Sequence, residues 1–343
     1  MKTMKASVLH SCGEPLVYED VEIPVIGPGE ILVKNKACGI CGTDLHIIDG
    51  WGYVPKLPFI QGHEPAGVVE AVGEGVLDFK PGDRVVTNNF FTCGKCFYCR
   101  TNRETQCTDL DGILGVLKHN GGFAQYFKIP ARQVFHLPDC ISFNEGAIIS
   151  DAVVTCVHAA QQARLAPGEI VLIISVGGLG GTLIQICKKY GAKTIVTVRS
   201  DEKRKRAEEL GADYVINTRN DGAVDEIKSI TGHGVSCAFD CVGDTDTMTL
   251  CMDSLANGGR LVIVGYSQQR YPLDPRRVAV HELEIIGSRC GGRQCTTEAI
   301  DFVASPDWKP MVTDIFPLKN ANEALLCLRQ GKTLGRIVLS IDD

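Results

Sequence analysis

The sequence predicts an α/β protein of two domains, one with a doubly wound parallel sheet and one with a partly open β-barrel. At 343 residues the chain exceeds the usual size of a single hydrophobic core. Short β-type runs separated by glycine and proline turns fill the first 150 residues, whereas strands and helices alternate from Ile170 onward. Such alternation is typical of a parallel sheet with helices on both faces. We therefore expect one domain at 1–150, completed by 289–343, and the other at 151–288.

The individual elements follow from the same pattern. In the first domain we expect brief strands at 8–10, 31–33, 67–72 and 84–86. In the second domain we expect helices at 150–165, 180–190 and 201–210, and strands at 170–175, 194–198, 214–216, 236–240 and 260–264. The regular alternation stops after 288, where helices at 297–303 and 320–330 and a strand at 335–340 could return to the first domain.

Composition excludes several classes of function. The net charge of −6 offers no broad basic field, so neither nucleic acid nor an anionic membrane is an expected partner. The strongest apolar stretch, at 170–176, is far too short to cross a bilayer. No apolar segment follows the charged N-terminus, so we expect no signal peptide. Sixteen cysteines in a chain of this kind favour a reducing, cytoplasmic location, with some thiols binding metal.

Four cysteines lie close together at Cys93, Cys96, Cys99 and Cys107. Zinc favours four tetrahedral sulfur ligands, and two-residue gaps let a tight loop wrap one ion with backbone amides facing the sulfurs. Because all four positions are filled, such a metal is structural and cannot react. Free or disulfide-bonded cysteines are the first alternative, and an iron–sulfur cluster is the second, since it uses similar spacing.

A second group of metal-binding residue types has a different character. Cys41, Thr43 and His46 are followed, about twenty residues later, by the pair His63 and Glu64. One thiolate, one imidazole and nearby carboxylates form an incomplete zinc shell, which leaves a position for a reacting oxygen. By spacing alone, a Cys and a His in a loop-rich domain are more often packing residues.

A glycine-rich turn ends the strand expected at 170–175 and opens a helix, which is the context of a dinucleotide-binding fingerprint. Ser175 replaces the first glycine of the G-x-G-x-x-G pattern, so the literal motif fails. Gly177 and Gly180 remain for close approach to a pyrophosphate and for helix packing. The residues expected at the cofactor here are Ser175, Gly177, Gly178, Leu179 and Gly180.

Cofactor choice depends on the end of the next strand, where NAD sites carry an acidic residue. Arg199 takes that position and Ser200 follows it. A guanidinium can pair with a 2′-phosphate through two hydrogen bonds, and the hydroxyl adds a donor. Lys203 and Arg204 are expected to assist, and a solvated basic face of the following helix is the alternative. Asp201 is expected to cap the following helix. These residues predict NADP(H).

Two segments in the first domain carry a resemblance to a known family. Residues 39–46 read Gly-Ile-Cys-Gly-Thr-Asp-Leu-His, and residues 62–69 read Gly-His-Glu-Pro-Ala-Gly-Val-Val. Both are similar to the zinc-containing medium-chain alcohol dehydrogenase family, whose structural zinc lobe corresponds to the four-cysteine run. The resemblance covers nearly the whole chain. It implies a GroES-like catalytic domain, a Rossmann-type nucleotide domain and two zinc ions per chain.

The resemblance also implies a ligand set for the catalytic zinc. Cys41 and His63 would bind the ion, with Glu64 beside it or exchanging onto it. The family carries Cys, Asp or Glu as third ligand at the start of the helix that enters the nucleotide domain, and that position is Asp151. Cys156 lies five residues later on a different face of the helix, so we expect it in the core.

Further roles follow from the same resemblance. Thr43 would accept the substrate hydroxyl proton, which then travels through the cofactor ribose to His46. Trp51 and Phe91 are expected to wall the substrate pocket, which would suit a modest, partly apolar alcohol or aldehyde without excluding a polyol or secondary alcohol.

The remaining cofactor contacts are expected from three later segments. Val242, Gly265 and Tyr266 follow two strands and would border the nicotinamide. Arg336 resembles a family arginine near the pyrophosphate, and a surface arginine at a strand start is the alternative.

The expected function is zinc-dependent hydride transfer between NADP(H) and an alcohol, aldehyde or ketone, in a homodimer or homotetramer. One alternative is an NAD(H)-dependent polyol or secondary-alcohol dehydrogenase. Another is a zinc-independent enoyl or quinone reductase of the same superfamily, which would lack both cysteine-containing metal sets. A third is a non-catalytic protein that keeps the fold.

Overall fold

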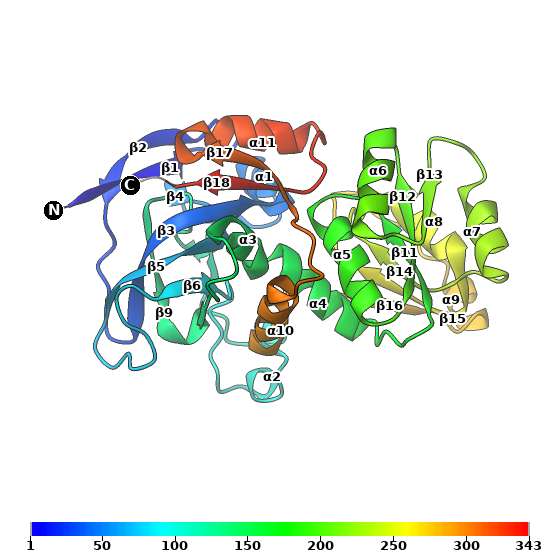
Figure 1. Ribbon diagram of the computed structural model, residues 1–343, viewed down its shortest axis with the longest axis horizontal. Coiled ribbons are helices and arrows are strands. Elements are labelled where there is room, and N and C mark those ends of the chain that lie inside the picture. The colour runs from blue at the N-terminus through cyan, green and yellow to red at the C-terminus, as the bar shows by residue number, and fades with distance from the viewer. Residues whose placement is uncertain (1, 342–343) are drawn as a thin grey trace. The chain divides into compact units, whose positions relative to one another are not determined.

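The computed structural model describes residues 2–341, which form two compact units (Figure 1). Unit 1 runs to Val154 and resumes at Gly291, and unit 2 is Thr155–Cys290. The chain therefore leaves unit 1 once and returns to it once, close to the expected positions at 150 and 289.

Unit 1 is built mainly of antiparallel strands. Its largest sheet has seven strands in the order β10-β6-β5-β3-β18-β17, with β9 also paired to β3. Their bounds are β3 (Glu30–Ile40), β5 (Glu64–Val72), β6 (Arg84–Thr87), β9 (Tyr126–Pro130), β10 (Val134–His136), β17 (Val312–Pro317) and β18 (Arg336–Ser340). Side chains along β3 alternate between buried and half-buried positions, as expected for a strand with one face on a core.

Two smaller sheets complete the strands of unit 1. The order β2-β1-β4 joins β1 (Thr3–Leu9), β2 (Val17–Glu22) and β4 (Phe59–Ile60), and a second sheet joins β7 (Ile113–Leu114) and β8 (Lys118–His119). The helices assigned to unit 1 are α1 (Gly42–Ile48), α2 (Phe97–Arg100), α3 (Phe143–Ala147), α10 (Arg293–Ala304) and α11 (Ala321–Arg329). Most are short, so the sheets and their connecting loops form most of this unit.

Unit 2 is a single parallel sheet of six strands in the order β13-β12-β11-β14-β15-β16. Their bounds are β11 (Ile170–Ile174), β12 (Lys193–Val198), β13 (Tyr214–Asn217), β14 (Val235–Asp240), β15 (Leu255–Ile263) and β16 (Glu284–Gly287). The strand order reverses at β11, because β12 and β13 extend on one side and β14, β15 and β16 on the other. Ligands of such sheets bind at the carboxyl ends of the strands next to this reversal.

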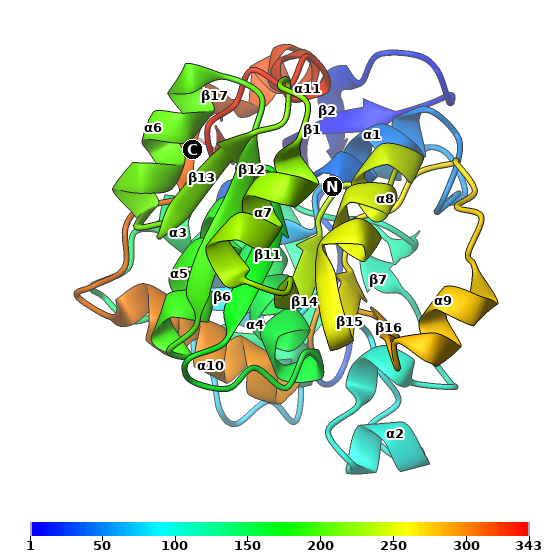
Figure 2. The ribbon, with the colours of Figure 1, turned by 90° about the vertical axis from the view of Figure 1, so that its right-hand side faces the viewer.

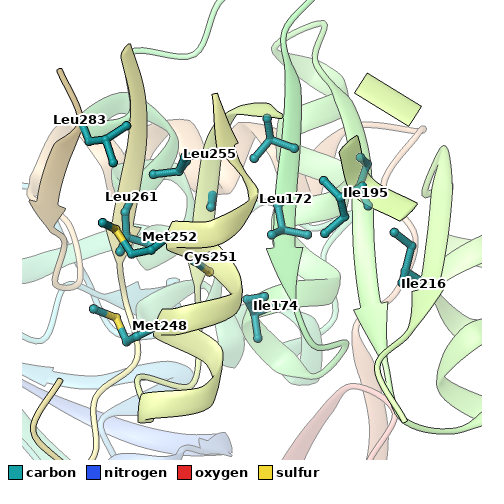
Figure 3. Close-up of a cluster of buried hydrophobic side chains, with 13 residues drawn as sticks. Leu172, Ile174, Ile195, Ile216, Met248, Cys251, Met252, Leu255, Leu261 and Leu283 are labelled. Atoms are coloured by element: carbon teal, nitrogen blue, oxygen red, sulfur yellow. The ribbon is translucent and has the colours of Figure 1, made fainter. Parts of the chain in front are cut away.

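Helices cover both faces of the parallel sheet (Figure 2). The bounds are α4 (Ala152–Gln162), which begins in unit 1, α5 (Gly178–Lys189), α6 (Asp201–Leu210), α7 (Ala223–Thr231), α8 (Thr245–Ser254) and α9 (Pro275–Val280). Helix α8 packs on the sheet through its side chains Met248, Cys251 and Met252, which lie in one apolar cluster with Leu172 and Ile174 of β11 (Figure 3). The expected doubly wound α/β fold is thus confirmed.

Several elements were not expected from the sequence. Helices α7 and α8 are largely polar, and of α7 only Ile227 is fully enclosed. Strand β16 lies at the sheet edge and is mostly exposed, so it lacks the apolar run that marks the central strands. Segments with such weak patterns form strands and helices mainly because they pack against neighbouring elements, and less because of their local propensity.

Candidate active site

The four-cysteine lobe has the geometry of a site for one tetrahedral ion. Cys93 lies 3.9 Å from Cys99, and Cys96 lies 3.9 Å from Cys107, measured between the sulfurs. Metal–sulfur bonds of about 2.3 Å in a tetrahedron place the sulfurs about 3.8 Å apart. A four-iron cluster would hold the thiolates farther apart, since each binds a separate iron. The residues therefore fit a single ion.

Backbone amides stabilise the thiolate form of Cys93 and Cys96, whereas burial raises the pKa of Cys99 to about 12. The amides of Cys93, Cys96 and Cys99 point at the sulfurs of Cys107, Cys93 and Cys96, at 3.3 to 3.5 Å. Hydrogen bonds from the Cys99 and Thr108 amides lower the pKa of Cys96 to about 6. Metal ions bind thiolate and not thiol, so the loop is arranged to hold a cation.

Replacing Cys96 by serine is expected to remove one metal ion per chain and to open the lobe. Structural zinc binding supplies about 10 to 16 kcal/mol to zinc-finger peptides at neutral pH. Metal analysis should show the loss, and limited proteolysis should become fast between residues 93 and 107. The control is Cys140→Ser, an exposed thiol of the same unit. Unchanged metal content in Cys96→Ser would contradict a metal role for the lobe.

A second donor cluster brings together Cys41, His63, Glu64 and Asp151. One ligand atom from each lies within 4.8 Å of all the others. Cys41 follows the end of β3, His63 and Glu64 stand at the start of β5, and Asp151 follows a 3-10 turn at Ile148–Ser150. The predicted ligand set is thus assembled in unit 1. Its mixture of one sulfur, one nitrogen and two carboxylates fits a metal with an exchangeable position.

Asp44 orients this cluster, although the sequence analysis did not single it out. Its carboxylate is buried, lies 3.5 Å from Nδ1 of His63 and accepts a hydrogen bond of 2.9 Å from the Cys41 amide. The Gln61 side chain donates to the Asp44 carbonyl. With Nδ1 facing Asp44, the other imidazole nitrogen, Nε2, faces Glu64 and Asp151. Metal-binding histidines are commonly held by a carboxylate in this way.

Replacing Asp44 by asparagine is expected to weaken metal binding at the Cys41 cluster by about 10- to 100-fold. The amide would keep the shape of the side chain but lose the charge that orients His63. Competition with a chelator measures the affinity. The matched control is Asp49→Asn in the same segment, where the carboxylate pairs with Arg329 at the surface. Equal affinities in both variants would show that Asp44 has no such role.

Arg336 connects the two carboxylates of the cluster. Its Nε donates to Glu64 at 3.0 Å, and its Nη2 contacts both Glu64 and Asp151, the latter at 2.9 Å. Burial raises the pKa of Glu64 to about 7 against the opposing effect of Arg336. Burial also tends to raise the pKa of Asp151, but the hydrogen bond and charge of His63 and the charge of Arg336 have a larger combined effect, so this pKa is lowered.

Arg336 is therefore buried and does not lie at the surface, which was the alternative expectation. Only 6% of it is exposed, and its guanidinium is occupied by two carboxylates of unit 1. The expected contact with the cofactor pyrophosphate stays a prediction, because Nη1 of the guanidinium has N–H donors beyond these contacts.

Other predicted residues lie at different distances from the cluster. Thr43 Oγ1 is 3.9 Å from the Cys41 sulfur. The rings of His46 and Trp51 stack with their centroids 3.9 Å apart, and burial lowers the pKa of His46. Phe91, expected at the substrate pocket, lies instead in the core of the barrel, where its ring stacks on His119.

In unit 2 the turn after β11 has the shape of a phosphate-binding loop. Ser175 adopts a left-handed conformation with φ of 71°, so it occupies the position that a glycine usually takes. Gly177 caps α5, whose first residue is Gly178. A Cβ atom at Gly180 would collide with the Ser175 carbonyl, so glycine is required there. The helix N-terminus supplies amides for an anion.

A cavity of about 540 Å³ lies beyond this turn. Its wall includes Ser175, Arg199, Lys203, Asn220 and Val242. Burial, followed by the charge of Arg199, lowers the pKa of Lys203, so two cations repel each other on one wall. An anion between them would relieve that repulsion. Arg199 forms no ion pair or hydrogen bond within residues 2–341.

Two expectations at this cavity need correction. Of the two helix cations expected to assist, Lys203 lines the cavity as expected, whereas Arg204 points away, since its guanidinium donates to the Val215 carbonyl at 2.9 Å. Asp201 does not cap α6. Ser200 does, accepting from the Lys203 amide. Neighbouring residues of a helix point in different directions, so a shift of one residue decides which side chain faces the cavity.

The other predicted cofactor residues follow β14 and β15. Asp240 is buried and accepts hydrogen bonds from the Val242 and Gly243 amides, which holds that turn. A Cβ atom at Gly265 would collide with the backbone of Cys241. Tyr266 is 43% exposed. The turns after β14 and β15 thus lie in close contact, which is possible because Gly265 has no side chain.

Comparison with known proteins places the chain in a family. The family model described as an alcohol dehydrogenase GroES-like domain matches residues 27–139, and that of a zinc-binding dehydrogenase matches residues 178–305. An alcohol dehydrogenase of Geobacillus stearothermophilus is 38% identical over 341 residues, 99% of this chain and 100% of the relative. The chain belongs to the zinc-type medium-chain alcohol dehydrogenase family.

Two further relatives of this alcohol dehydrogenase chain support the assignment. An NAD-dependent alcohol dehydrogenase of Sulfolobus acidocaldarius is 35% identical over 350 residues, covering 98% of the chain and 100% of that relative. The crystal structure of an alcohol dehydrogenase of Aeropyrum pernix matches with a TM-score of 0.92 and 35% identity, over 98% and 99% of the two chains. Unit 1 is accordingly a GroES-like domain and unit 2 a Rossmann-type domain.

The chain is thus an oxidoreductase of the alcohol dehydrogenase type, acting on small molecules. Within residues 2–341, none of the helices has the length and apolar character needed to cross a bilayer.

Proposed function

We propose that the protein is a zinc-dependent alcohol dehydrogenase that uses NADP(H) and an alcohol, aldehyde or ketone. The observation that carries the proposal is the convergence of Cys41, His63, Glu64 and Asp151 within 4.8 Å. A zinc ion there would act as a Lewis acid on the substrate oxygen, while the nicotinamide would exchange hydride with the adjacent carbon. A second zinc ion would hold the four-cysteine lobe.

Side chains of the protein would transfer the proton released from the substrate. In the oxidation direction the alcohol loses one hydride and one proton. The Thr43 hydroxyl, two residues after Cys41, would accept that proton and pass its own onward. His46 would receive it after the cofactor ribose, and its lowered pKa keeps the imidazole neutral and able to accept. Trp51, stacked on His46, would form one wall for a partly apolar substrate.

NADP(H) is favoured by the wall of the cavity in unit 2. Arg199 and Lys203 line it. Within residues 2–341, Arg199 forms no ion pair or hydrogen bond. A 2′-phosphate would supply the missing counter-charge, with Ser200 available at the start of α6. The pyrophosphate would lie on the loop from Ser175 to Gly180, and Val242, Gly265 and Tyr266 would border the nicotinamide.

Two alternatives differ in cofactor or metal. An NAD(H)-dependent polyol or secondary-alcohol dehydrogenase would leave Arg199 without a partner. A zinc-independent enoyl or quinone reductase would not need the donor clusters, so both metal geometries argue against it.

We also propose a homo-oligomer, dimer or tetramer, working in the cytoplasm. Strand β16 ends the parallel sheet with exposed backbone and with Ile285 36% exposed, and Val280 nearby in the sequence is 64% exposed. Edge strands of this kind pair readily with a second copy. None of the sixteen cysteines, all of which lie within residues 2–341, forms a disulfide, which suits a reducing compartment. Light scattering on the wild type and on Ile285→Lys should show a smaller particle for the variant.

One experiment tests the main proposal. Metal content is measured on purified protein, and initial rates are measured on a panel of alcohols, aldehydes and ketones with NADPH and NADH in parallel. We expect two zinc ions per chain and faster turnover with NADPH. Full activity after metal removal, or a clear preference for NADH, would reject the corresponding part.

A further inference from the structure

The N-terminus of helix α10 is capped by a carboxylate from the four-cysteine lobe. Gly292, the N-cap residue, has no side chain that could accept from the first amides of the helix. Glu104 lies in the lobe between Cys99 and Cys107, and its carboxylate accepts a hydrogen bond of 2.8 Å from the Arg293 amide. The lobe therefore supplies, from 189 positions away, a cap that helices commonly obtain from their own N-cap side chain.

Both sides of this contact are adapted to it. The first turn of α10, residues 293–296, reads Arg-Gln-Cys-Thr, so Glu104 supplies the negative charge that a helix N-terminus favours. A Cβ atom at Gly292 would collide with the Glu104 carboxylate, so only glycine leaves room for it. On the lobe side, the Glu104 carbonyl accepts a hydrogen bond of 3.0 Å from the Cys107 amide. Opening of the lobe would thus remove the cap from α10.

The same helix terminus packs on the segment that carries Asp151. Helix α4 begins directly after Asp151, and Val154 lies in its first turn. A Cβ atom at Gly291 would lie 2.8 Å from the Val154 side chain, so the two segments are in close contact. The buried Asn88 side chain donates to the Gly291 carbonyl at 2.8 Å and to the Thr296 hydroxyl at 2.9 Å. The start of α10 is thus fixed against the start of α4.

Buried hydrogen bonds hold the Asp151 segment to two strands of the main sheet. The hydroxyls of Thr87 and Ser150 lie 3.2 Å apart, and both side chains are fully buried. The Ser150 hydroxyl also donates to the Pro65 carbonyl, at 3.4 Å. Ser150 and Pro65 are the sequence neighbours of Asp151 and Glu64. A continuous set of contacts within unit 1 therefore joins the four-cysteine lobe to two donors of the proposed catalytic metal.

We propose that Glu104 couples the two metal sites: an occupied four-cysteine lobe holds α10 in place, and α10 holds Asp151 in position to bind the metal of the Cys41 cluster. Glu104 is a positioning residue, since it acts through α10. The inference rests on the proposed metal at each cluster. Because coupling between two sites is reciprocal, metal at either cluster raises the affinity of the other. The lobe, which cannot react, thus controls how readily the reacting site is filled.

The test measures cobalt affinity at the Cys41 cluster of the full-length protein by competition with a chelator, followed by absorption. Cys96→Ser, which empties the lobe, should weaken this affinity by about tenfold, and Glu104→Ala should weaken it by a similar factor although all four cysteines remain. Glu104→Ala/Cys96→Ser should be no weaker than Cys96→Ser, whereas independent effects would multiply to about a hundredfold. The control is Glu226→Ala, which removes a first-turn carboxylate of α7 in unit 2 and should change the affinity less than about twofold.

A further variant separates coupling from ordinary helix capping. In Glu104→Ala/Gly292→Asp, the substitution at 292 uses the space that Glu104 leaves and caps α10 from its own N-cap position. The backbone of Gly292, with φ of −77° and ψ of −176°, suits a capping side chain. The temperature of unfolding should therefore rise above that of Glu104→Ala. Cobalt affinity at the Cys41 cluster should stay about tenfold weaker than in the wild type, because the link to the lobe is still missing.

A loss that does not multiply and that the new cap does not repair supports the inference. Cobalt affinity within about twofold of wild type in Glu104→Ala overturns it, as does a multiplied loss in Glu104→Ala/Cys96→Ser. Recovery of the wild-type affinity in Glu104→Ala/Gly292→Asp also overturns it, because Glu104 would then be a helix cap and nothing more. If Cys96→Ser does not fold, the two variants that keep all four cysteines decide. A wild type that binds fewer than two cobalt ions per chain would instead reject the proposed metal at one cluster, and with it the basis of the coupling.

Discussion

Replacing Cys41 by serine is expected to lower kcat by at least about a thousandfold, which corresponds to about 4 kcal/mol of transition-state stabilisation. The hydroxyl is a poor substitute for a thiolate, so the cluster loses its only sulfur donor and its best fixed negative charge. NADPH should bind nearly as in the wild type, because the predicted cofactor loop and the cavity of Arg199 belong to unit 2.

The measurement combines initial rates, metal analysis and fluorescence titration with NADPH. The variant should keep the metal of the four-cysteine lobe and lose the other. Cys140→Ser is the control, since this exposed thiol lies outside both donor clusters. Full activity in Cys41→Ser would remove the basis for a metal-dependent mechanism. Loss of NADPH binding together with activity would indicate general misfolding.

Replacing Arg199 by aspartate is expected to reverse the coenzyme preference. Each charge-assisted hydrogen bond to a phosphate is worth about 1.5 to 3 kcal/mol, so kcat/KM with NADPH should fall about a hundredfold or more. The new carboxylate repels the 2′-phosphate and can accept hydrogen bonds from the ribose hydroxyls of NADH. The efficiency with NADH should therefore rise.

Lys205→Asp is the matched control for this reversal, because it makes the same charge change on α6 outside the cavity wall. Initial rates with both coenzymes at a fixed substrate concentration measure the effect. A wild type that already prefers NADH, or an Arg199→Asp variant with an unchanged ratio, would assign the cavity to NAD(H) and leave Arg199 unexplained.

Sequence spacing was most informative where the site is local. Cys93 to Cys107 span a single loop, so their spacing alone indicated a closed metal site, and the sulfur distances agree with it. Likewise the run from Ile170 to Gly180 predicted a strand, a tight turn and a helix, and Ser175 adopts the left-handed conformation that the missing glycine would have taken.

Helix rotation limited the prediction of the coenzyme wall. Arg199 lies on the cavity as expected, but of the two cations expected to assist it, Lys203 lines the cavity and Arg204 does not. Adjacent helical residues point about 100° apart, so an error of one residue exchanges a cavity side chain for one that contacts β13. Phe91 failed for a related reason, since its burial depends on how the barrel strands close around it.

The sequence by itself determined the alternation of strands and helices, the four-cysteine lobe and the cofactor loop, because each depends on residues that are near in the chain. Tertiary structure decided the rest of the metal site. Arg336 is 272 positions from Glu64 and 185 from Asp151, yet the pairing of β18 and β5 with β3 brings them into contact. Strand register specifies such neighbours, and register is set by the packing of the whole sheet.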